Sequence, residues 1–193
     1  MTKLIAMGGE PATGKTTLIF ELIKLADDWA NVKPQKLLDA VYSAKLNLYI
    51  LGKYEKNGTV FQGTDRLSMA VQPDAEKFIV DAVNPDSKMY GSNIIFEGDR
   101  LFNGKFLDHI LSNIEEANFK ILVLDVPHSV KEQRHVDRND TQDDKFKNSR
   151  ATKVANICSS LMLMEYIEVM PNENLEHQRD IIDFIGNFFH WSE

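Results

Sequence analysis

A glycine-rich segment near the amino terminus constrains the fold of this 193-residue chain more than any other feature. Lys3–Met7 is a short apolar run typical of a buried β-strand, and Gly8 and Gly9 end it. After Gly14, apolar residues recur at helical spacing at Leu18, Ile19, Leu22, Ile23 and Leu25. The succession of strand, glycine turn and helix predicts the opening of an α/β domain.

The turn itself has the sequence Gly9-Glu10-Pro11-Ala12-Thr13-Gly14-Lys15-Thr16, which matches the pattern G-x-x-x-x-G-K-[ST]. In this context, glycines let backbone N–H groups point at phosphate oxygens beside the positive end of the helix. Lys15 would reach the β- and γ-phosphates, and the Thr16 hydroxyl would bind the Mg²⁺ ion that bridges them. Together with Thr17, these residues predict a site for a nucleoside triphosphate and Mg²⁺. A glycine turn that contains Lys-Thr by chance is the less favoured alternative.

Elsewhere the chain alternates between strand and helix patterns, and an antiparallel ribbon is expected at about 37–63 because Asn57-Gly58 is a hairpin signal. The other expected elements are helices at 72–83, about 105–117, about 150–164 and 177–189, and strands at 93–96, 120–126 and 166–170. Strands that alternate with helices favour a parallel sheet covered on both faces. The sequence therefore predicts one α/β domain over residues 1–193, with the P-loop NTPase fold.

Residues 128–153, called the lid segment below, are rich in charge and poor in apolar residues. The basic residues of this segment are Lys131, Arg134, Arg138, Lys145, Lys147, Arg150 and Lys153. Such a run is usually a solvated face, but Arg150 and Lys153 open the helix that is expected to return to the core. These two side chains would therefore point from a rigid base toward the γ-phosphate of a bound triphosphate. His128 and His135 are expected at the surface, because two histidines without a third ligand make a poor metal site.

Charged residues also follow the apolar run 93–96, in the order Glu97-Gly98-Asp99-Arg100. The carboxyl ends of strands in open α/β sheets face the ligand crevice, so these residues are candidates for the active site. Glu97 would contact Mg²⁺ through water. If the γ-phosphoryl group is transferred to a second molecule, called the acceptor below, Arg100 would bind a phosphate of that acceptor. Asp65, in a polar turn, is a second candidate carboxylate, and either Asp65 or Asp99 would accept a proton from the acceptor. A turn aspartate beside a solvated Arg66 is an equally favoured interpretation of the Asp65 region.

The aromatic residues of the expected ribbon, Tyr42, Tyr49, Tyr54 and Phe61, favour ordinary strand packing over stacking on a flipped base. The segment 171–174 follows the last expected strand and is expected to form a polar turn.

Composition and charge exclude several classes of protein. The 22 Lys and Arg residues against 29 Asp and Glu residues give a formal charge of −7, which disfavours tight sequence-blind nucleic-acid binding but allows a local basic groove. Cys158 is the only cysteine, so an internal disulfide and a cysteine-based zinc site are excluded. The first apolar run is far too short for a signal peptide or a membrane span. These features predict a cytoplasmic protein that does not enter membranes.

Among users of triphosphates, the chain lacks the [NT]-K-x-D pattern of GTPases, and ATP-driven motors are usually larger. Three segments resemble the small P-loop nucleotide kinases, in particular phage-borne thymidylate-kinase-like proteins: Gly63-Thr64-Asp65-Arg66-Leu67-Ser68, Phe96-Glu97-Gly98-Asp99-Arg100-Leu101 and Arg150-x-x-Lys153-x-x-Asn156-Ile157. Some members of that group are assigned to phosphorylating the hydroxymethyl group of 5-hydroxymethyluracil in DNA. The resemblance implies an ATP- and Mg²⁺-dependent kinase acting on a nucleotide or on modified-base DNA. It also implies an adenine contact at 171–174, where a plain polar turn is an equally favoured interpretation.

Two alternatives remain open. One is a nucleoside monophosphate kinase, although the chain lacks the Gly-Phe-Pro-Arg form of adenylate kinases. The other is a nucleotide-switched ATPase or binding module. The sequence does not indicate an oligomeric state.

Overall fold

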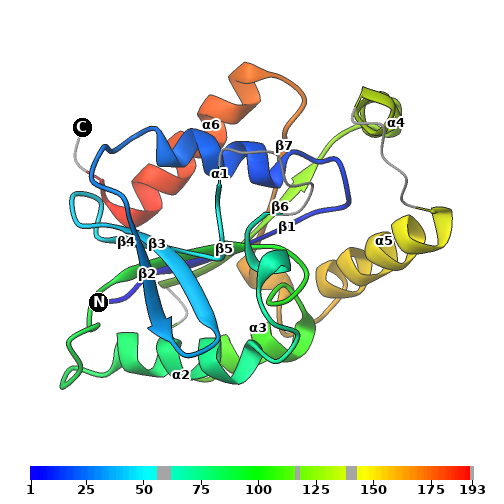
Figure 1. The fold of residues 1–193 in the computed structure, drawn as a ribbon. Coiled ribbons are helices and arrows are strands. Elements are labelled where there is room, and N and C mark those ends of the chain that lie inside the picture. The colour runs from blue at the N-terminus through cyan, green and yellow to red at the C-terminus, as the bar shows by residue number, and fades with distance from the viewer. Residues whose placement is uncertain (56–61, 116–117, 138–142, 192–193) are drawn as a thin grey trace.

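The computed structural model describes residues 1–55, 62–115, 118–137 and 143–191 (Figure 1). Within these ranges seven strands form one sheet in the order β2-β3-β4-β5-β1-β6-β7. The strands are β1 (Leu4–Gly8), β2 (Ala30–Gln35), β3 (Leu38–Ser43), β4 (Leu48–Leu51), β5 (Asn93–Glu97), β6 (Phe119–Asp125) and β7 (Ile167–Pro171). The five strands from β4 to β7 in this order are parallel, whereas β3 and β2 extend the β4 edge in antiparallel fashion. The predicted α/β class with a mostly parallel sheet is confirmed.

Helices cover both faces of the sheet (Figure 1). They are α1 (Lys15–Ile23), α2 (Gln72–Val83), α3 (Gly104–Leu111), α4 (His128–Asp137), α5 (Asp144–Cys158) and α6 (Leu175–Phe189), with short 3₁₀ turns at Thr64–Arg66 and Met164–Tyr166. The side chains of α1 and α6 share one apolar cluster with one face of the sheet, and those of α2, α3 and α5 share another with the opposite face. Every residue of β1 and β5 is buried, so the sheet centre is the core of the molecule.

The antiparallel ribbon differs in part from its expectation. It begins earlier, with β2, a polar edge strand that contains Pro34 and that the sequence patterns do not reveal. Proline removes a ladder hydrogen bond and is tolerated at a sheet edge. The expected turn at Asn57-Gly58 lies outside the described residues. Within them, Lys53 and Gly63 pair their backbones in both directions, at 3.0 and 2.9 Å, and so bring residue 63 back to the end of β4.

Helix limits also need correction. The helix expected at about 150–164 is α5, which starts at Asp144 and ends at Cys158, because the Asp143 side chain caps it by accepting from the Phe146 N–H at 2.7 Å. The helix expected at about 105–117 is α3, which ends at Leu111. The lid segment therefore consists, in its described part, of α4 and the first two thirds of α5.

The ribbon tyrosines pack as expected. Tyr49 is buried between Tyr42 and Phe78, with ring centroids 4.3 and 5.1 Å away, and Tyr54 packs edge-on against Phe20 at 6.1 Å. Phe61 lies outside the described residues. Packing thus accounts for these three tyrosines.

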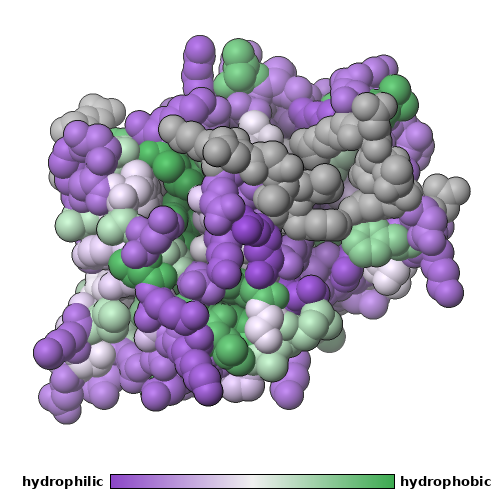
Figure 2. All heavy atoms as spheres, in the orientation of Figure 1, coloured by the Kyte–Doolittle hydropathy of each residue, from purple (hydrophilic) through white to green (hydrophobic). Residues whose placement is uncertain are grey.

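Figure 2 shows that hydrophilic side chains dominate the face of the molecule seen in Figure 1. None of the helices in the described ranges is long and apolar enough to cross a membrane.

Candidate functional site

The predicted phosphate-binding turn, called the glycine loop below (residues 9–16), joins β1 to α1 at the carboxyl end of the sheet centre. Its backbone curls through positive φ values at Gly9, Ala12 and Gly14. Gly14 has φ +90°, and a Cβ there would lie 2.5 Å from Nδ2 of Asn172, so both the conformation and the space require glycine. Gly14, the N-cap residue of α1, makes no side-chain cap hydrogen bond. The positive end of this helix at the loop suits an anion.

The Lys15 ammonium lies inside this curl. It donates to the carbonyl oxygens of Gly9 at 2.9 Å and Glu10 at 2.8 Å, and it lies 3.5 Å from the Thr13 hydroxyl. The lysine thus contacts both the beginning and the middle of the loop. A phosphate group held by the loop would meet this cation.

Glu97, at the end of β5, contacts the glycine loop, which follows the neighbouring strand β1. The Thr16 hydroxyl donates to its Oε1 at 3.3 Å, and the Glu97 side chain is buried. Burial raises the pKa of Glu97 to about 7, against the opposing effect of the nearby Lys15 charge. Gly63 packs against the same carboxylate, where a Cβ would lie only 2.3 Å from Oε1.

The Thr16 hydroxyl and the Glu97 carboxylate are suitable ligands for Mg²⁺. The part of the chain that the structure describes contains no group of three His, Cys, Asp or Glu side chains that could hold a metal by themselves. Magnesium ions in nucleotide sites keep several waters and take the rest of their ligands from one or two protein groups and from phosphates. The Thr16 hydroxyl and the Glu97 carboxylate supply such groups, and a divalent cation would offset the cost of a buried carboxylate.

Asp65 and Asp99 form the second acidic part of the site. The Asp99 N–H donates to Asp65 Oδ1 at 2.7 Å, which holds the turn before α2 against the end of β5. Burial, followed by the negative charge of Asp99, raises the pKa of Asp65. Arg100 opposes that rise through its positive charge, and its Nε is buried without a hydrogen-bond partner among the described residues. The structure thus brings Asp65, expected only in a separate polar turn, together with Asp99 at the end of β5, where Glu97 and Arg100 also lie.

The predicted cations of α5 do not point freely toward the glycine loop. Arg150 Nε lies 2.7 Å from Asp99 Oδ2, and Lys153 Nζ lies 3.4 Å from Oδ1 and 3.0 Å from the Asp99 carbonyl oxygen. The Arg150 guanidinium also lies over the Phe146 ring, 4.6 Å from its centroid. Asn156, two turns after Arg150, lines a cavity between α5 and α3. Asp99 thus serves in this structure as the counter-ion of α5.

Helix α4 contacts the glycine loop through residues that the sequence patterns do not single out as a unit. Lys131 Nζ lies 2.9 Å from Glu10 Oε2. Arg134 donates to the carbonyl oxygens of Ala12 at 3.1 Å, Asn172 at 2.8 Å and Glu173 at 3.2 Å. The spacing of Lys131 and Arg134, three residues apart, puts both on one helical face and could have revealed the pair.

Two other expectations about the lid segment have different outcomes. Arg138, one of the basic residues of the lid segment, lies outside the described residues. His128 is exposed as expected, but His135 is only 8% exposed, which corrects its assignment to the surface. His135 is buried because α4 has a face that points into the molecule, although few residues of this helix are apolar.

Asn172 anchors the glycine loop from the opposite side. This residue is fully buried, its Nδ2 donates to the Thr13 carbonyl oxygen at 2.7 Å, and its N–H donates to the Asp125 carbonyl oxygen at 2.9 Å. The end of β7 therefore fixes the shape of a loop that is 159 residues earlier in the chain. The expectation for 171–174 was an adenine contact or a polar turn, so this bracing role is a finding of the structure.

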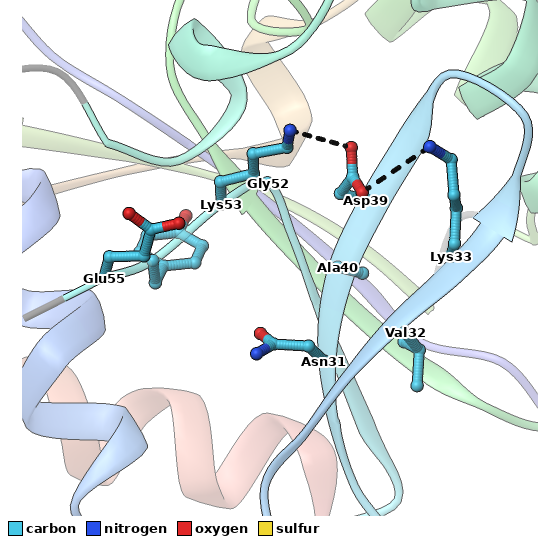
Figure 3. A pocket seen from close by; sticks show the side chains of 9 residues that line it. Asn31, Val32, Lys33, Asp39, Ala40, Gly52, Lys53 and Glu55 are labelled. Carbon is cyan, nitrogen blue, oxygen red and sulfur yellow. Dashed lines mark ion pairs between the residues drawn. The ribbon is translucent and has the colours of Figure 1, made fainter.

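Two cavities flank the site. One, of about 300 Å³, lies over the ribbon, where Lys33 and Lys53 both approach the Asp39 carboxylate at 3.9 and 3.5 Å (Figure 3). The other, of about 450 Å³, lies between α3 and α5 and includes Lys153 in its wall. Lys153 thus lines this cavity and also contacts Asp99.

Comparison with protein-family models and with curated protein sequences finds no match.

Proposed function

We propose that this protein is a kinase of the P-loop NTPase fold that transfers the γ-phosphoryl group of ATP to a hydroxyl group of a nucleotide or nucleobase. The observation that carries the proposal is the meeting of Lys15, Thr16 and Glu97 at the carboxyl ends of two adjacent parallel strands. A cation, a hydroxyl and a buried carboxylate at that place suit a triphosphate with its metal ion.

The glycine loop and Lys15 would bind the β- and γ-phosphates through N–H groups and one positive charge. Mg²⁺, when bound, would neutralise phosphate charge, with Thr16 and Glu97 as its protein contacts. The position of Arg134 beside Ala12 and Asn172 would place its guanidinium near the nucleoside end of ATP. The loop, Lys15 and Arg134 would together set the direction in which the triphosphate lies.

In the transfer, the acceptor oxygen forms a bond to the γ-phosphorus while the bond from that phosphorus to the β–γ bridging oxygen breaks, which leaves ADP. The proton of the acceptor hydroxyl goes to a carboxylate. We assign this role to Asp65, because the Asp99 carboxylate is already paired with Arg150 and Lys153. The raised pKa of Asp65 brings it closer to the range in which a carboxylate accepts a proton efficiently.

The acceptor that the sequence resemblance favours is the hydroxymethyl group of 5-hydroxymethyluracil in DNA, and a nucleoside monophosphate is the alternative. Incubation with γ-labelled ATP and a panel of nucleosides, nucleoside monophosphates and DNA with and without 5-hydroxymethyluracil tests both. Label in the modified DNA alone supports the first acceptor. Label in thymidine monophosphate but not in DNA supports the second, and ADP formation without label transfer to any acceptor contradicts the kinase assignment.

A second candidate function is a nucleotide-switched ATPase or binding module. The ion pair between Glu10 and Lys131 favours it, since a nucleotide that enters the glycine loop would act on α4 through this contact. The rate of ATP hydrolysis without an acceptor separates the two functions. A kinase hydrolyses ATP slowly alone, because its site excludes water only when the acceptor completes it.

A further inference from the structure

The buried carboxylate of Glu97 receives little hydrogen bonding. An ionised carboxylate offers about four acceptor positions. Among the residues that the structure describes, Thr16 is the one hydrogen-bond donor to it, at 3.3 Å, which is long for a hydroxyl donor. The backbone of Glu97 is better fixed, because the buried Thr64 hydroxyl donates to its carbonyl oxygen at 2.8 Å. The orientation of the carboxylate therefore depends on the other groups around it.

The hydroxyl group of Tyr54 lies close to this carboxylate, across Gly63. A Cβ built on Gly63 would lie 2.3 Å from Glu97 Oε1 and 2.9 Å from the Tyr54 hydroxyl oxygen, so both oxygens approach the same point. Gly63 has φ +66°, a conformation that favours glycine, and the lack of a side chain there lets the two groups come close.

Tyr54 is held in place by its ring, while its hydroxyl group makes a weak hydrogen bond. The ring packs edge-on against Phe20 of α1, with 6.1 Å between centroids, and the side chain is buried. The hydroxyl donates to the Leu51 carbonyl oxygen at 3.4 Å, which is again long for such a bond. Burial, followed by the negative charge of Glu97, raises the pKa of Tyr54, so the group keeps its proton. A fixed donor is thus available beside a carboxylate with few donors.

Backbone contacts tie the tyrosine to the end of β5. The residue before it, Lys53, pairs with Gly63 in both directions, at 3.0 and 2.9 Å. Gly52 packs directly on the same segment, since a Cβ there would lie 2.3 Å from the Gly63 carbonyl carbon. Thr64, the next residue, is bonded to the carbonyl oxygen of Glu97. The tyrosine and the carboxylate therefore belong to one connected unit.

We propose that Tyr54 is a positioning residue whose hydroxyl group donates, directly or through one water, to the Glu97 carboxylate that binds the metal ion. The inference rests on the proposed kinase function, since it concerns the Mg²⁺ contact of that site. Tyr54 itself would contact neither the ion nor the phosphates. The hydroxyl groups of Thr16 and Tyr54 would together orient the carboxylate. Loss of such an outer partner typically lowers metal affinity by about 10- to 100-fold.

The isosteric variant Tyr54→Phe removes the hydroxyl group and keeps the ring against Phe20. We expect it to raise the dissociation constant of Mn²⁺, measured with bound nucleotide, by about tenfold or more. Mn²⁺ is the probe because it takes the same oxygen ligands as Mg²⁺ and has an electron paramagnetic resonance signal. The matched control is Tyr49→Phe, a buried tyrosine of the same ribbon that packs on the opposite face of the sheet, where its hydroxyl contacts Met89 Sδ at 3.3 Å.

Two further variants separate the hydroxyl group from the ring. Tyr54→Leu removes both, so wild-type affinity in Tyr54→Phe with weak binding in Tyr54→Leu would show a packing role and overturn the proposal. In Glu97→Gln the carboxylate is absent, while Thr16 and the phosphates remain as ligands, so weaker binding is still measurable. Adding Tyr54→Phe to Glu97→Gln should change the affinity little, and an equal effect in both backgrounds would overturn the proposal. Thermal melting shows whether each variant is folded.

The measurement is a titration of the full chain with Mn²⁺ and a non-hydrolysable ATP analogue, followed by electron paramagnetic resonance. A titration without protein gives the binding to the analogue alone. Weaker binding in Tyr54→Phe, with Tyr49→Phe equal to the wild type, supports the role of Tyr54. Equal affinities of Tyr54→Phe and the wild type overturn that role and leave the proposed function intact. A wild-type protein that adds nothing to the binding by the analogue contradicts both.

Kinetics provide a second readout that does not depend on the titration. With Mg²⁺, Tyr54→Phe should raise the KM for the metal ion and leave kcat at saturating metal close to that of the wild type, because the hydroxyl group positions a metal contact and takes no part in the transfer. A lower kcat at saturating metal with an unchanged KM for Mg²⁺ overturns the positioning role.

Discussion

The carboxylate of Asp99 lies 2.7 Å from Nε of Arg150, so the end of β5 and the middle of α5 are held together by an ion pair. Lys153 joins the same carboxylate, and the Asp99 N–H contacts Asp65. One acidic residue thus positions two cations on one side and a second carboxylate on the other. Loss of its charge should therefore change both the helix and the acidic centre.

Asp99→Asn should loosen α5. The change leaves two cations without their carboxylate, and we expect the free energy of unfolding to fall by roughly 1 kcal/mol, a modest value because the pair is partly exposed. Hydrogen exchange over 144–158 should increase. Asp86→Asn, at an exposed position after α2, is the control. If Asp99→Asn and Arg150→Met have additive effects on stability, the two residues are not coupled.

Lys15→Ala should abolish phosphoryl transfer and leave the fold intact, because the Lys15 side chain contacts loop carbonyls and contributes nothing to the apolar core. The loss should be about 10²- to 10³-fold or more, as for other lost electrostatic stabilisers. Turnover and circular dichroism measure the two effects. The matched control is Lys24→Ala, at the exposed end of the same helix, where the lysine pairs with Glu21. Retention of near wild-type activity by Lys15→Ala would contradict the site.

Asp65→Asn should lower kcat by about 10²- to 10⁴-fold, the usual contribution of a general base. The dissociation constant of the acceptor should change little, since the proton moves in the transition state. Steady-state kinetics and titration of the acceptor separate the two quantities. An equal loss in kcat for Asp99→Asn with none for Asp65→Asn would transfer the role to Asp99.

Glu97→Gln should stabilise the ligand-free protein at high pH. The pKa of Glu97 is about 7 in the folded state and 4.5 in the reference state, so the folded protein binds more protons between these values. Folding stability therefore falls as pH rises from 4.5 to 7, by up to about 3 kcal/mol. Glutamine does not ionise and avoids this fall. Urea unfolding in EDTA should show a higher free energy of unfolding for Glu97→Gln than for the wild type at pH 8, and this gain should disappear near pH 4.5. A difference between the two proteins that does not change with pH would contradict the burial of an ionising carboxylate.

Asn172→Asp should weaken ATP binding. The new side chain lacks the N–H that donates to the Thr13 carbonyl oxygen and brings a carboxylate toward it. Loss of a buried hydrogen bond costs about 1–3 kcal/mol, which predicts an increase of roughly 5- to 150-fold in the dissociation constant of ATP. Asn174→Asp serves as control, because the Asn174 side chain caps α6 and aspartate caps equally well. Equal ATP affinities of the two variants would show that Asn172 does not position the glycine loop for ATP binding.

Local patterns made the centre of this site predictable. The glycine loop, Lys15 and Thr16 lie within one motif, and Glu97 follows a short buried strand whose neighbour in the sheet the α/β pattern anticipates. The sequence also identified the carboxylates and cations that meet at Asp99. Which cation pairs with which carboxylate depends on where α5 begins, and the Asp143 cap that sets this limit lies inside a run of charge without periodicity.

The remaining features depend on contacts between distant residues. Nothing in the pattern around Asn172 indicates its hydrogen bond to Thr13, because the two residues become neighbours only when β7 joins the sheet. The strand β2 was missed for a similar reason, since its polar residues form a strand by pairing with β3 at an edge. His135 became buried because α4 docks on the glycine loop through Lys131 and Arg134.

The hydrogen bond from Asn172 to Thr13 also bears on the order of events during synthesis on the ribosome. The glycine loop is made 159 residues before the residue that fixes its shape. Until β7 has left the exit tunnel, the loop lacks its brace, and the proposed nucleotide site is incomplete. A nucleotide that binds as proposed would therefore stabilise the chain only after β7 has joined the sheet, and its binding energy would act on a late step of folding.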